Sequence, residues 1–385
     1  MKVHQQKILA IIFSVLTLSI CSCKETELII PENGYSWPAP NRDYWPTKGW
    51  KIMELESLNI NSSKMQIADE FAKNDHLSRA LLVVKNGYLV FEKYYGEGGP
   101  DNSTNLWSVT KSVSSAIIGL LYDQHEFSSM HTKMTSLMPD YPEFGEITLH
   151  HVLTQTTGLN WVEEGPLWVQ WAFSNDWVSE ALSRGYQSKP GEKFFYSSAN
   201  SHFLTALVDY KSDISVGALA KQKLFDPMGI EFYEVDSNLQ YNNWLEYTYP
   251  AYQTWRKDPN GIECASFGLY LKARDMAKFG YLYLNKGFWD GKQLISKDWV
   301  EISTKEHIRN IYGRYSYGYQ WYITKVGSYP AFLASGFGGQ IIGVVPSLDL
   351  VVVLKFEAEN PVDPKTGSSH DDMHLFELVV NAVKE

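Results

Sequence analysis

The stretch Ser108-Val109-Thr110-Lys111 stands at the start of the first strongly helical part of the chain. Apolar residues such as Val113, Ile117 and Leu121 recur behind it at helical spacing, which predicts a helix with its apolar face packed inward. Serine and lysine three residues apart are neighbours on one helical face. A desolvated lysine can take the proton of such a serine and make it a nucleophile. The stretch therefore indicates a nucleophile with its base or, alternatively, a capping serine beside a solvent-facing lysine.

Strand signals lie on both sides of this helix in the sequence. Residues 80–84 and 88–94 flank Asn86-Gly87, which predicts a hairpin of two antiparallel strands. The same kinds of pattern predict strands at 318–324, 340–345 and 350–356 and helices at about 269–285 and 371–383. Because these strands do not alternate with helices as βαβ units do, we expect an α+β fold, an antiparallel sheet flanked by helices and assembled from both ends of the chain.

The middle of the chain differs from both ends. Between about residues 122 and 260 the strand signal fades, and short helical pieces, turns and tryptophans take over. We therefore expect an inserted, mainly helical subdomain at 122–260. The α/β core would then consist of residues 52–121 together with 261–385.

The N-terminus has the features of an export signal. Lys2 and Lys7 precede an apolar run over residues 8–20, and a small residue stands just before Cys23. This resembles a bacterial lipoprotein signal over residues 1–22 with Cys23 as the lipidated residue. A permanent transmembrane anchor is the alternative, but it needs roughly 18 or more consecutive apolar residues.

Residues 23–51 are rich in proline and begin with polar and acidic residues, which predicts a tether. We therefore expect a membrane-anchored protein of the cell envelope, facing the periplasm or the surface.

Composition excludes several classes of protein. A chain of 385 residues with 44% hydrophobic and only 20% charged residues can bury a sizeable core, so intrinsic disorder is excluded. With 34 basic against 44 acidic residues, a nucleic-acid partner is not expected. Three cysteines are too few for a disulfide scaffold, and His370 and His374 lack an evident third ligand for zinc. We expect no metal and no cofactor.

Two further motifs follow Ser108 and Lys111 in the order of a known superfamily. The first is Tyr196-Ser197-Ser198, and the second is Ala334-Ser335-Gly336 on a later strand. With them, residues 55–380 resemble the serine β-lactamase-like superfamily. That superfamily includes class C β-lactamases, D-alanyl-D-alanine carboxypeptidases, family VIII esterases and 6-aminohexanoate-oligomer hydrolases. The resemblance implies a β-lactamase/transpeptidase-like fold.

The resemblance also implies roles for individual residues. Ser108 would be the nucleophile, Lys111 its general base, and Tyr196 the group that relays the proton to the leaving group. The backbone N–H groups of Ser108 and Phe337 would form the oxyanion hole. A purely structural Tyr196, buried with its hydroxyl bonded to backbone, is the alternative for that residue.

Two positions depart from the pattern of the superfamily. Ser198 stands where the superfamily usually has asparagine, and Ala334 stands where it has lysine or histidine. Ser198, Ser335 and Gly336 would still line the substrate site, but β-lactam recognition is put in doubt. A literal Lys365-Thr366-Gly367 lies in a proline-flanked loop, and we do not take it for the strand motif.

These observations predict a serine hydrolase that forms an acyl-enzyme with a small-molecule ester, amide or peptide substrate. We expect weak or no β-lactamase activity, and motifs closest to those of the esterases and amide-oligomer hydrolases. A catalytically silent binding protein of the cell envelope, with a penicillin-binding-like fold, is the alternative. Retention of Ser108, Lys111 and Tyr196 together favours the enzyme.

Overall fold

A computed structural model describes residues 34–163, 165–234, 252–357 and 371–383. Its largest element is an eight-stranded sheet. The strands of this sheet are β1 (Ser78–Lys85), β2 (Tyr88–Tyr94), β8 (Ile308–Tyr312), β9 (Tyr315–Tyr317), β10 (Tyr322–Val326), β11 (Tyr329–Gly336), β12 (Gln340–Val345) and β13 (Leu350–Phe356). Two small sheets are formed by β3 (Thr104–Asn105), β4 (Thr254–Trp255) and β5 (Leu269–Leu271), and by β6 (Phe288–Trp289) and β7 (Lys292–Gln293).

The large sheet joins the two ends of the described chain. Its order is β2-β1-β13-β12-β11-β10-β9-β8, and all neighbouring strands are antiparallel. The first hairpin lies beside the last strand, since β1 pairs with β13 from Ser78 opposite Phe356 to Lys85 opposite Leu350. The predicted antiparallel α+β fold is confirmed.

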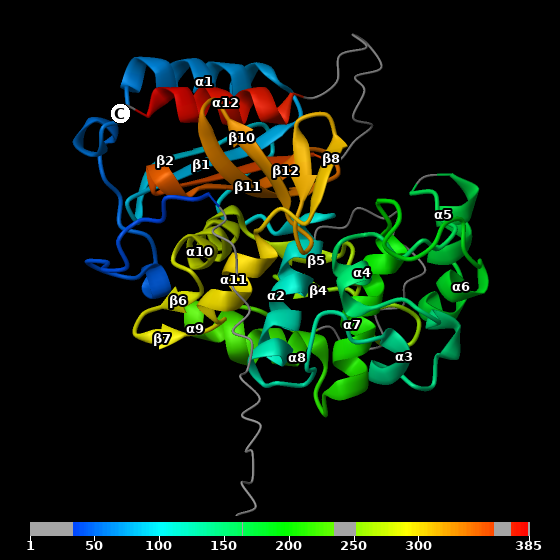
Figure 1. Cartoon of the computed structure of the whole chain (residues 1–385). Coiled ribbons are helices and arrows are strands. Elements are labelled where there is room, and N and C mark those ends of the chain that lie inside the picture. Colours follow the sequence, from blue (N-terminus) through cyan, green and yellow to red (C-terminus); the bar gives the residue numbers. More distant parts are fainter. Residues whose placement is uncertain (1–33, 164, 235–251, 358–370, 384–385) are drawn as a thin grey trace, which may run out of the picture. The chain divides into compact units, whose positions relative to one another are not determined.

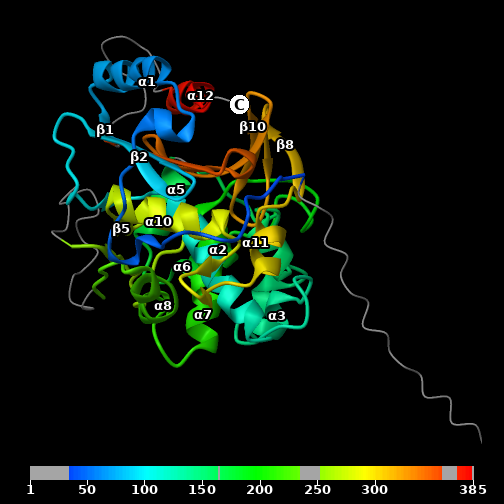
Figure 2. The same ribbon diagram turned by 90° about the vertical axis from the view of Figure 1, so that its left-hand side faces the viewer.

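Helices cover both faces of this sheet (Figures 1 and 2). On one face lie α1 (Ser62–Asn74) and α12 (Asp372–Ala382), and on the other lie α2 (Val109–Asp123) and α10 (Ala273–Leu284). Successive side chains of a strand point to opposite faces, and apolar residues occupy both sets of positions in β1. Leu81 and Val83 are buried under α1 and α12, whereas Leu82 and Val84 belong to the core on the other face.

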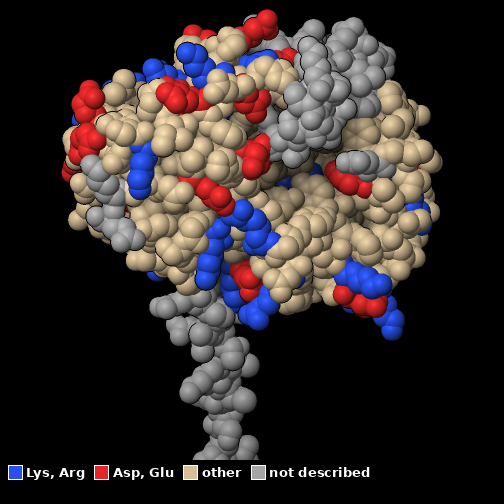
Figure 3. Space-filling model, turned by 90° about the horizontal axis from the view of Figure 1, so that it is seen from above, with Lys and Arg blue, Asp and Glu red and all other residues tan. Residues whose placement is uncertain are grey.

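The region between the first and second halves of the sheet is helical. Its helices are α3 (Met134–Leu137), α4 (Leu149–Leu153), α5 (Pro166–Ala172), α6 (Trp177–Ser183), α7 (Ser198–Lys211), α8 (Val216–Ala220) and α9 (Asp226–Met228), and α11 (Lys297–Ser303) follows α10. Residues 32–385 form one contact unit, so the predicted boundaries of an insertion at 122–260 stay a prediction. On the face seen from above the view of Figure 1, Lys and Arg side chains lie among Asp and Glu side chains (Figure 3).

Two predicted elements have different bounds in the structure. Residues 318–321 form the turn between β9 and β10, where Gln320 has φ of +64°. The buried amide of Gln320 donates to the carbonyls of Val152 and Leu153, which fixes this turn against α4. The helix predicted from residue 269 begins at Ala273, because Leu269–Leu271 pair as β5 with β3 and β4.

The segment predicted as a tether is partly packed on the core. Residues 1–33, including Cys23, lie outside the described residues. Within residues 34–51, Tyr35 donates a hydrogen bond to the carbonyl of Thr304, and Arg42 pairs with Asp349 at 2.6 Å. Trp45 packs against the core as well. Residues 34–51 therefore contact the core through partly buried aromatic rings, and the tether over residues 23–51 stays a prediction.

Gly280 allows α10 to pack closely on the sheet. A Cβ at this position would lie 2.6 Å from Cγ1 of Val351 and 2.7 Å from Cγ2 of Ile342. We expect Gly280→Ala to lower the free energy of unfolding by about 1–3 kcal/mol, because overpacking outweighs the better helix propensity of alanine. Urea denaturation measures this change, with the exposed Ser63→Ala on α1 as control. Equal or greater stability of Gly280→Ala would show that α10 can move away from the sheet without cost.

Candidate active site

Ser108 and Lys111 are in contact at the start of α2. Ser108 is the residue that precedes the helix, and Nζ of Lys111 donates to its Oγ at 2.9 Å. Lys111 is only 1% exposed. The alternative of a solvent-facing lysine is therefore wrong, and the predicted pair of nucleophile and base has the required geometry.

The remaining hydrogen-bonding capacity of Lys111 is used by two neighbouring segments. Its Nζ donates to the carbonyl of Ser266 at 3.1 Å and to Oγ of Ser198 at 3.3 Å. Burial lowers the pKa of Lys111 to about 8, although the carboxylate of Glu163 acts in the opposite direction. Lys111 can therefore lose its proton near neutral pH, as a general base for a serine must.

Tyr196 lies over the same lysine. Nζ of Lys111 is 4.7 Å from the centre of the Tyr196 ring, and Tyr322 stacks on this ring at 6.3 Å between centroids. Removal from water raises the pKa of Tyr196 well above its ordinary value, and a hydrogen bond with Ser108 only partly offsets this. Tyr196 is therefore protonated at neutral pH, and its hydroxyl can give a proton to a group held at Ser108.

The end of β11 touches the backbone of Ser108. A Cβ on Gly336 would lie 2.3 Å from the carbonyl oxygen of Leu106 and 3.1 Å from the backbone nitrogen of Ser108. Glycine is required here by this close approach. The next residue, Phe337, is the one to which the resemblance assigns the second donor of the oxyanion hole.

The other two residues of the strand motif differ in their surroundings. Ala334 is 1% exposed and belongs to the core on the α2 side of the sheet, so this position supplies neither a charge nor a hydrogen bond. Ser335 is half-buried and pairs with Ile341 of β12. The literal Lys365-Thr366-Gly367 lies outside the described residues.

Ser198 has protein partners for its polar groups. It is the first residue of α7 and is 2% exposed. Its backbone N–H donates to Oε2 of Glu163 at 2.8 Å, and its hydroxyl donates to Oε1 of the same carboxylate. Nothing in the sequence marked Glu163, because it follows Trp161 in a loop without a recognisable motif. Trp161 in turn donates to Oε2 of Glu163 at 2.8 Å.

The residue before the nucleophile has an unusual backbone conformation. Trp107 has φ of +48°, in the left-handed region that costs non-glycine residues of order 1–3 kcal/mol. The side chain of Asn105 holds this turn, since its Oδ1 accepts from the N–H of Trp107 at 2.9 Å and from that of Gly268 at 3.0 Å. Strain of this kind is typical of functional sites.

Aromatic rings pack around Trp107, the residue before Ser108. Phe337 is 43% exposed, and its ring centre lies 5.4 Å from that of Trp107. Phe267 lies 6.3 Å from Trp107 and 5.9 Å from Trp168 of α5, again between ring centres. The nucleophile is thus bordered by an apolar wall to which the helical region contributes.

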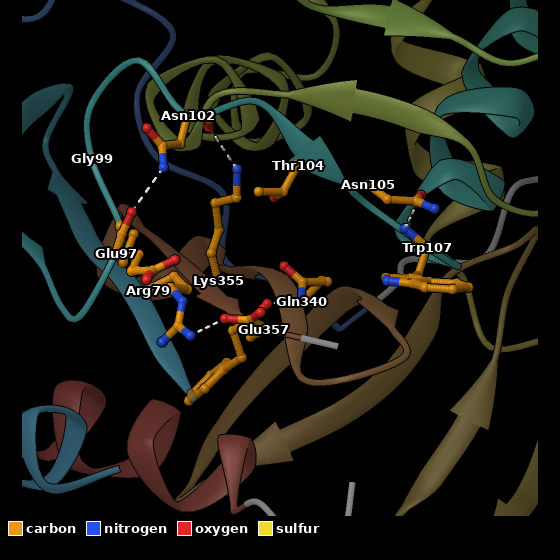
Figure 4. A pocket seen from close by; sticks show the side chains of 13 residues that line it. Arg79, Glu97, Gly99, Asn102, Thr104, Asn105, Trp107, Gln340, Lys355 and Glu357 are labelled. Carbon is orange, nitrogen blue, oxygen red and sulfur yellow. Dashed lines mark hydrogen bonds and ion pairs between the residues drawn. The ribbon is translucent and has the colours of Figure 1, made fainter. Parts of the chain in front are cut away.

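A cavity of about 110 Å³ lies beside the segment that leads into Ser108 (Figure 4). Lys355 of β13 extends along it, and Nζ of this lysine donates to the carbonyls of Asn102 at 3.2 Å and Leu271 at 2.8 Å. Burial lowers the pKa of Lys355 to about 7. Lys355 therefore ties the central sheet to the strand pair β3 and β5, from which the nucleophile segment starts.

Comparison with known proteins identifies the family. A family model described as Beta-lactamase matches residues 66–370. The chain belongs to the beta-lactamase family. The matched range contains Ser108, Lys111, Tyr196 and Gly336, so the site described above is the region that this beta-lactamase family model covers.

Individual relatives are distant. An uncharacterized protein of Alkalihalophilus pseudofirmus is 24% identical over 314 residues, which are 72% of this chain and 83% of the relative. A Bacillus anthracis structure assigned as a 6-aminohexanoate-dimer hydrolase is 19% identical, with a TM-score of 0.64 over 90% of this chain and 88% of that one. A family VIII carboxylesterase is 16% identical, with a TM-score of 0.61 over 83% and 96% of the two chains. A penicillin-binding protein homolog from Caulobacter crescentus is 18% identical, with a TM-score of 0.63 over 83% and 97%. These structures share the fold with this chain.

No helix among the described residues is long and apolar enough to cross a membrane. Nor do His, Cys, Asp and Glu side chains in the described ranges gather in a group of three or more that could hold a metal ion.

Proposed function

We propose that the chain is a serine hydrolase that cleaves esters or amides through an acyl-enzyme on Ser108. The observation that carries this proposal is the contact of 2.9 Å between Ser108 and a buried lysine whose pKa is lowered to about 8. A lysine kept partly neutral next to a serine hydroxyl is the arrangement that general-base activation requires.

In the first half of the reaction, neutral Lys111 takes the proton of Ser108 while Oγ attacks the carbonyl carbon. The backbone N–H groups of Ser108 and Phe337 stabilise the oxyanion that forms. Tyr196 then donates its proton to the leaving alcohol or amine, and the proton on Lys111 restores it. In the second half, water attacks the acyl-enzyme by the same proton transfers in reverse, and the acid is released.

The surroundings of Ser108 favour substrates without a carboxylate next to the scissile bond. Ala334 provides no cation on β11, and Phe337, Trp107 and Phe267 offer an apolar wall. Relatives with the same fold include a family VIII carboxylesterase and a protein assigned as an amide-dimer hydrolase. These relatives support an ester or amide substrate, and the absence of a cation at Ala334 is our reason for preferring it to a β-lactam.

A fluorophosphonate probe tests the nucleophile. We expect it to label Ser108, because Lys111 activates this hydroxyl, and we expect Ser108→Ala to lose both labelling and hydrolysis of p-nitrophenyl butyrate. Intact mass and peptide mapping measure the labelling, with the buried Ser266→Ala as control. A wild-type protein that is neither labelled nor active would favour the catalytically silent binding protein. Labelling of Ser266 would show that Ser266, and not Ser108, is the nucleophile.

A second test compares two substrates. We expect kcat/KM for nitrocefin to be far below that for p-nitrophenyl butyrate, because Ala334 cannot bind the β-lactam carboxylate. A lost hydrogen bond to a charged group costs about 1.5–3 kcal/mol, or about ten- to hundredfold in kcat/KM. The variant Ala334→Lys should reduce the difference between the two kcat/KM values. Nitrocefin turnover above that of the ester in the wild type would show that another residue binds the carboxylate.

We also propose that Cys23 carries the lipid of a lipoprotein. The signal-like sequence of residues 1–22 supports this proposal. Several acyl chains on one cysteine hold a protein firmly on a membrane, so the mature protein should need detergent for extraction, and mass spectrometry should find acyl groups on Cys23. If Cys23→Ala stays unprocessed but membrane-bound, the N-terminal run is itself the anchor.

A further inference from the structure

A carboxylate is connected to the catalytic lysine through one serine. Nζ of Lys111 donates to Oγ of Ser198, and the Ser198 hydroxyl donates its own proton to Oε1 of Glu163. The backbone N–H of Ser198 and the indole N–H of Trp161 both donate to Oε2, at 2.8 Å each. Glu163 is thus held by three donors, in one orientation, at the far end of a chain of hydrogen bonds that begins at Lys111.

This series of hydrogen bonds from Lys111 to Glu163 matters most when Lys111 is charged. On attack, the proton of Ser108 moves to Nζ, and an ammonium group forms at a position that is 1% exposed. Burial disfavours this charge, and a carboxylate nearby favours it. A serine that donates to a carboxylate is also a better acceptor for the lysine N–H, since hydrogen bonds in a chain polarise one another.

We propose that Glu163, acting through Ser198, is a positioning residue that stabilises the Lys111 ammonium during formation of the acyl-enzyme. This inference deepens the proposed function and rests on it for its kinetic consequence. Lys111 keeps enough basicity to accept the Ser108 proton because Glu163 offsets part of the effect of burial. Ser198 and Glu163 together occupy the side of Lys111 that faces α7.

The other groups around Lys111 do not supply this charge. Tyr196 faces it from the segment before α7 and has a raised pKa, so it is neutral. Cys264 approaches from the segment before β5, and burial raises the pKa of its thiol to about 11, so it is neutral as well near pH 8. Ser266 offers a backbone carbonyl, and β11 contributes Gly336 at the nucleophile. Among these described neighbours, Glu163 is the group that carries a negative charge.

A purely structural role for Glu163 is the competing explanation. Its bonds to Ser198 and Trp161 could simply hold the loop against the first turn of α7. Such a role would lower stability and activity at every pH alike. A role in stabilising the ammonium instead changes the pH at which Lys111 titrates, and this difference decides between the two.

The deciding experiment is a titration of Lys111 by NMR in the protein labelled with ¹³C at lysine Cε. The signal is assigned by its loss in Lys111→Ala. We expect a midpoint near pH 8 in the wild type and near pH 7 in Glu163→Gln, because an adjacent opposite charge changes a pKa by about 1 or more. Ser198→Ala should give a smaller decrease, since the carboxylate remains. The exposed Glu143→Gln is the matched control and should leave the midpoint unchanged.

The pH dependence of kcat/KM for p-nitrophenyl butyrate provides the kinetic counterpart. The acidic limb of the profile should move to lower pH in Glu163→Gln, because a lysine with a lower pKa loses its proton at lower pH. The value of kcat/KM should fall about tenfold at pH 9, because a weaker base accepts the Ser108 proton less well. At pH 6.5 the fall should be much smaller, since more of the lysine is then neutral than in the wild type. Glu163→Asp should have a kcat/KM at pH 9 between those of Glu163→Gln and the wild type.

An unchanged or raised midpoint in Glu163→Gln, in a variant that stays folded by circular dichroism, would overturn the inference. So would an equal change in Glu143→Gln. The NMR titration needs no turnover, so it decides the role of Glu163 even if the wild type hydrolyses no ester and the proposed function fails.

Discussion

The burial of one lysine beside one serine is the constraint on which the site depends. A lysine side chain that is 1% exposed must have partners for its N–H groups, and Lys111 finds them on three separate segments, at Ser108, Ser198 and Ser266. Each partner belongs to a different part of the chain. The start of α2, the start of α7 and the segment before β5 must therefore all be in place before the lysine can be buried at tolerable cost.

The large sheet supplies the fixed frame for this arrangement. Strand β11 ends at Gly336 against the backbone of Ser108, and Lys355 on β13 holds the segment from which the nucleophile emerges. The left-handed conformation of Trp107 is maintained by these contacts and by Asn105. A strained turn next to a nucleophile persists only where the surrounding structure determines it this completely.

Much of the frame could be predicted from the sequence because its signals are local. Strands β12 and β13 have the predicted bounds, since each is a run of apolar residues, and Asn86-Gly87 forms the predicted hairpin turn. Helical spacing places Ser108 and Lys111 on one face, and the later motifs favoured their contact over a solvent-facing lysine. Glu163 could not be found, because its part depends on a loop that reaches α7 only in three dimensions. Helix α1 could not be predicted because most of its surface is polar. The packing of residues 34–51 could not be predicted because their prolines indicate a tether, although their aromatic rings pack against the core.

The pairing of β1 with β13 sets the order in which the protein can mature. Ser78 lies opposite Phe356, so the first strand has no neighbour on that side until nearly the whole chain has been made. Contacts between residues this distant in sequence form slowly, because a long loop must close before they stabilise the fold. Since β11 lies in the same sheet as β13, the strand that ends beside Ser108 is part of a complete sheet only when β13 is present. The contacts that surround Ser108 are therefore complete only in the finished polypeptide.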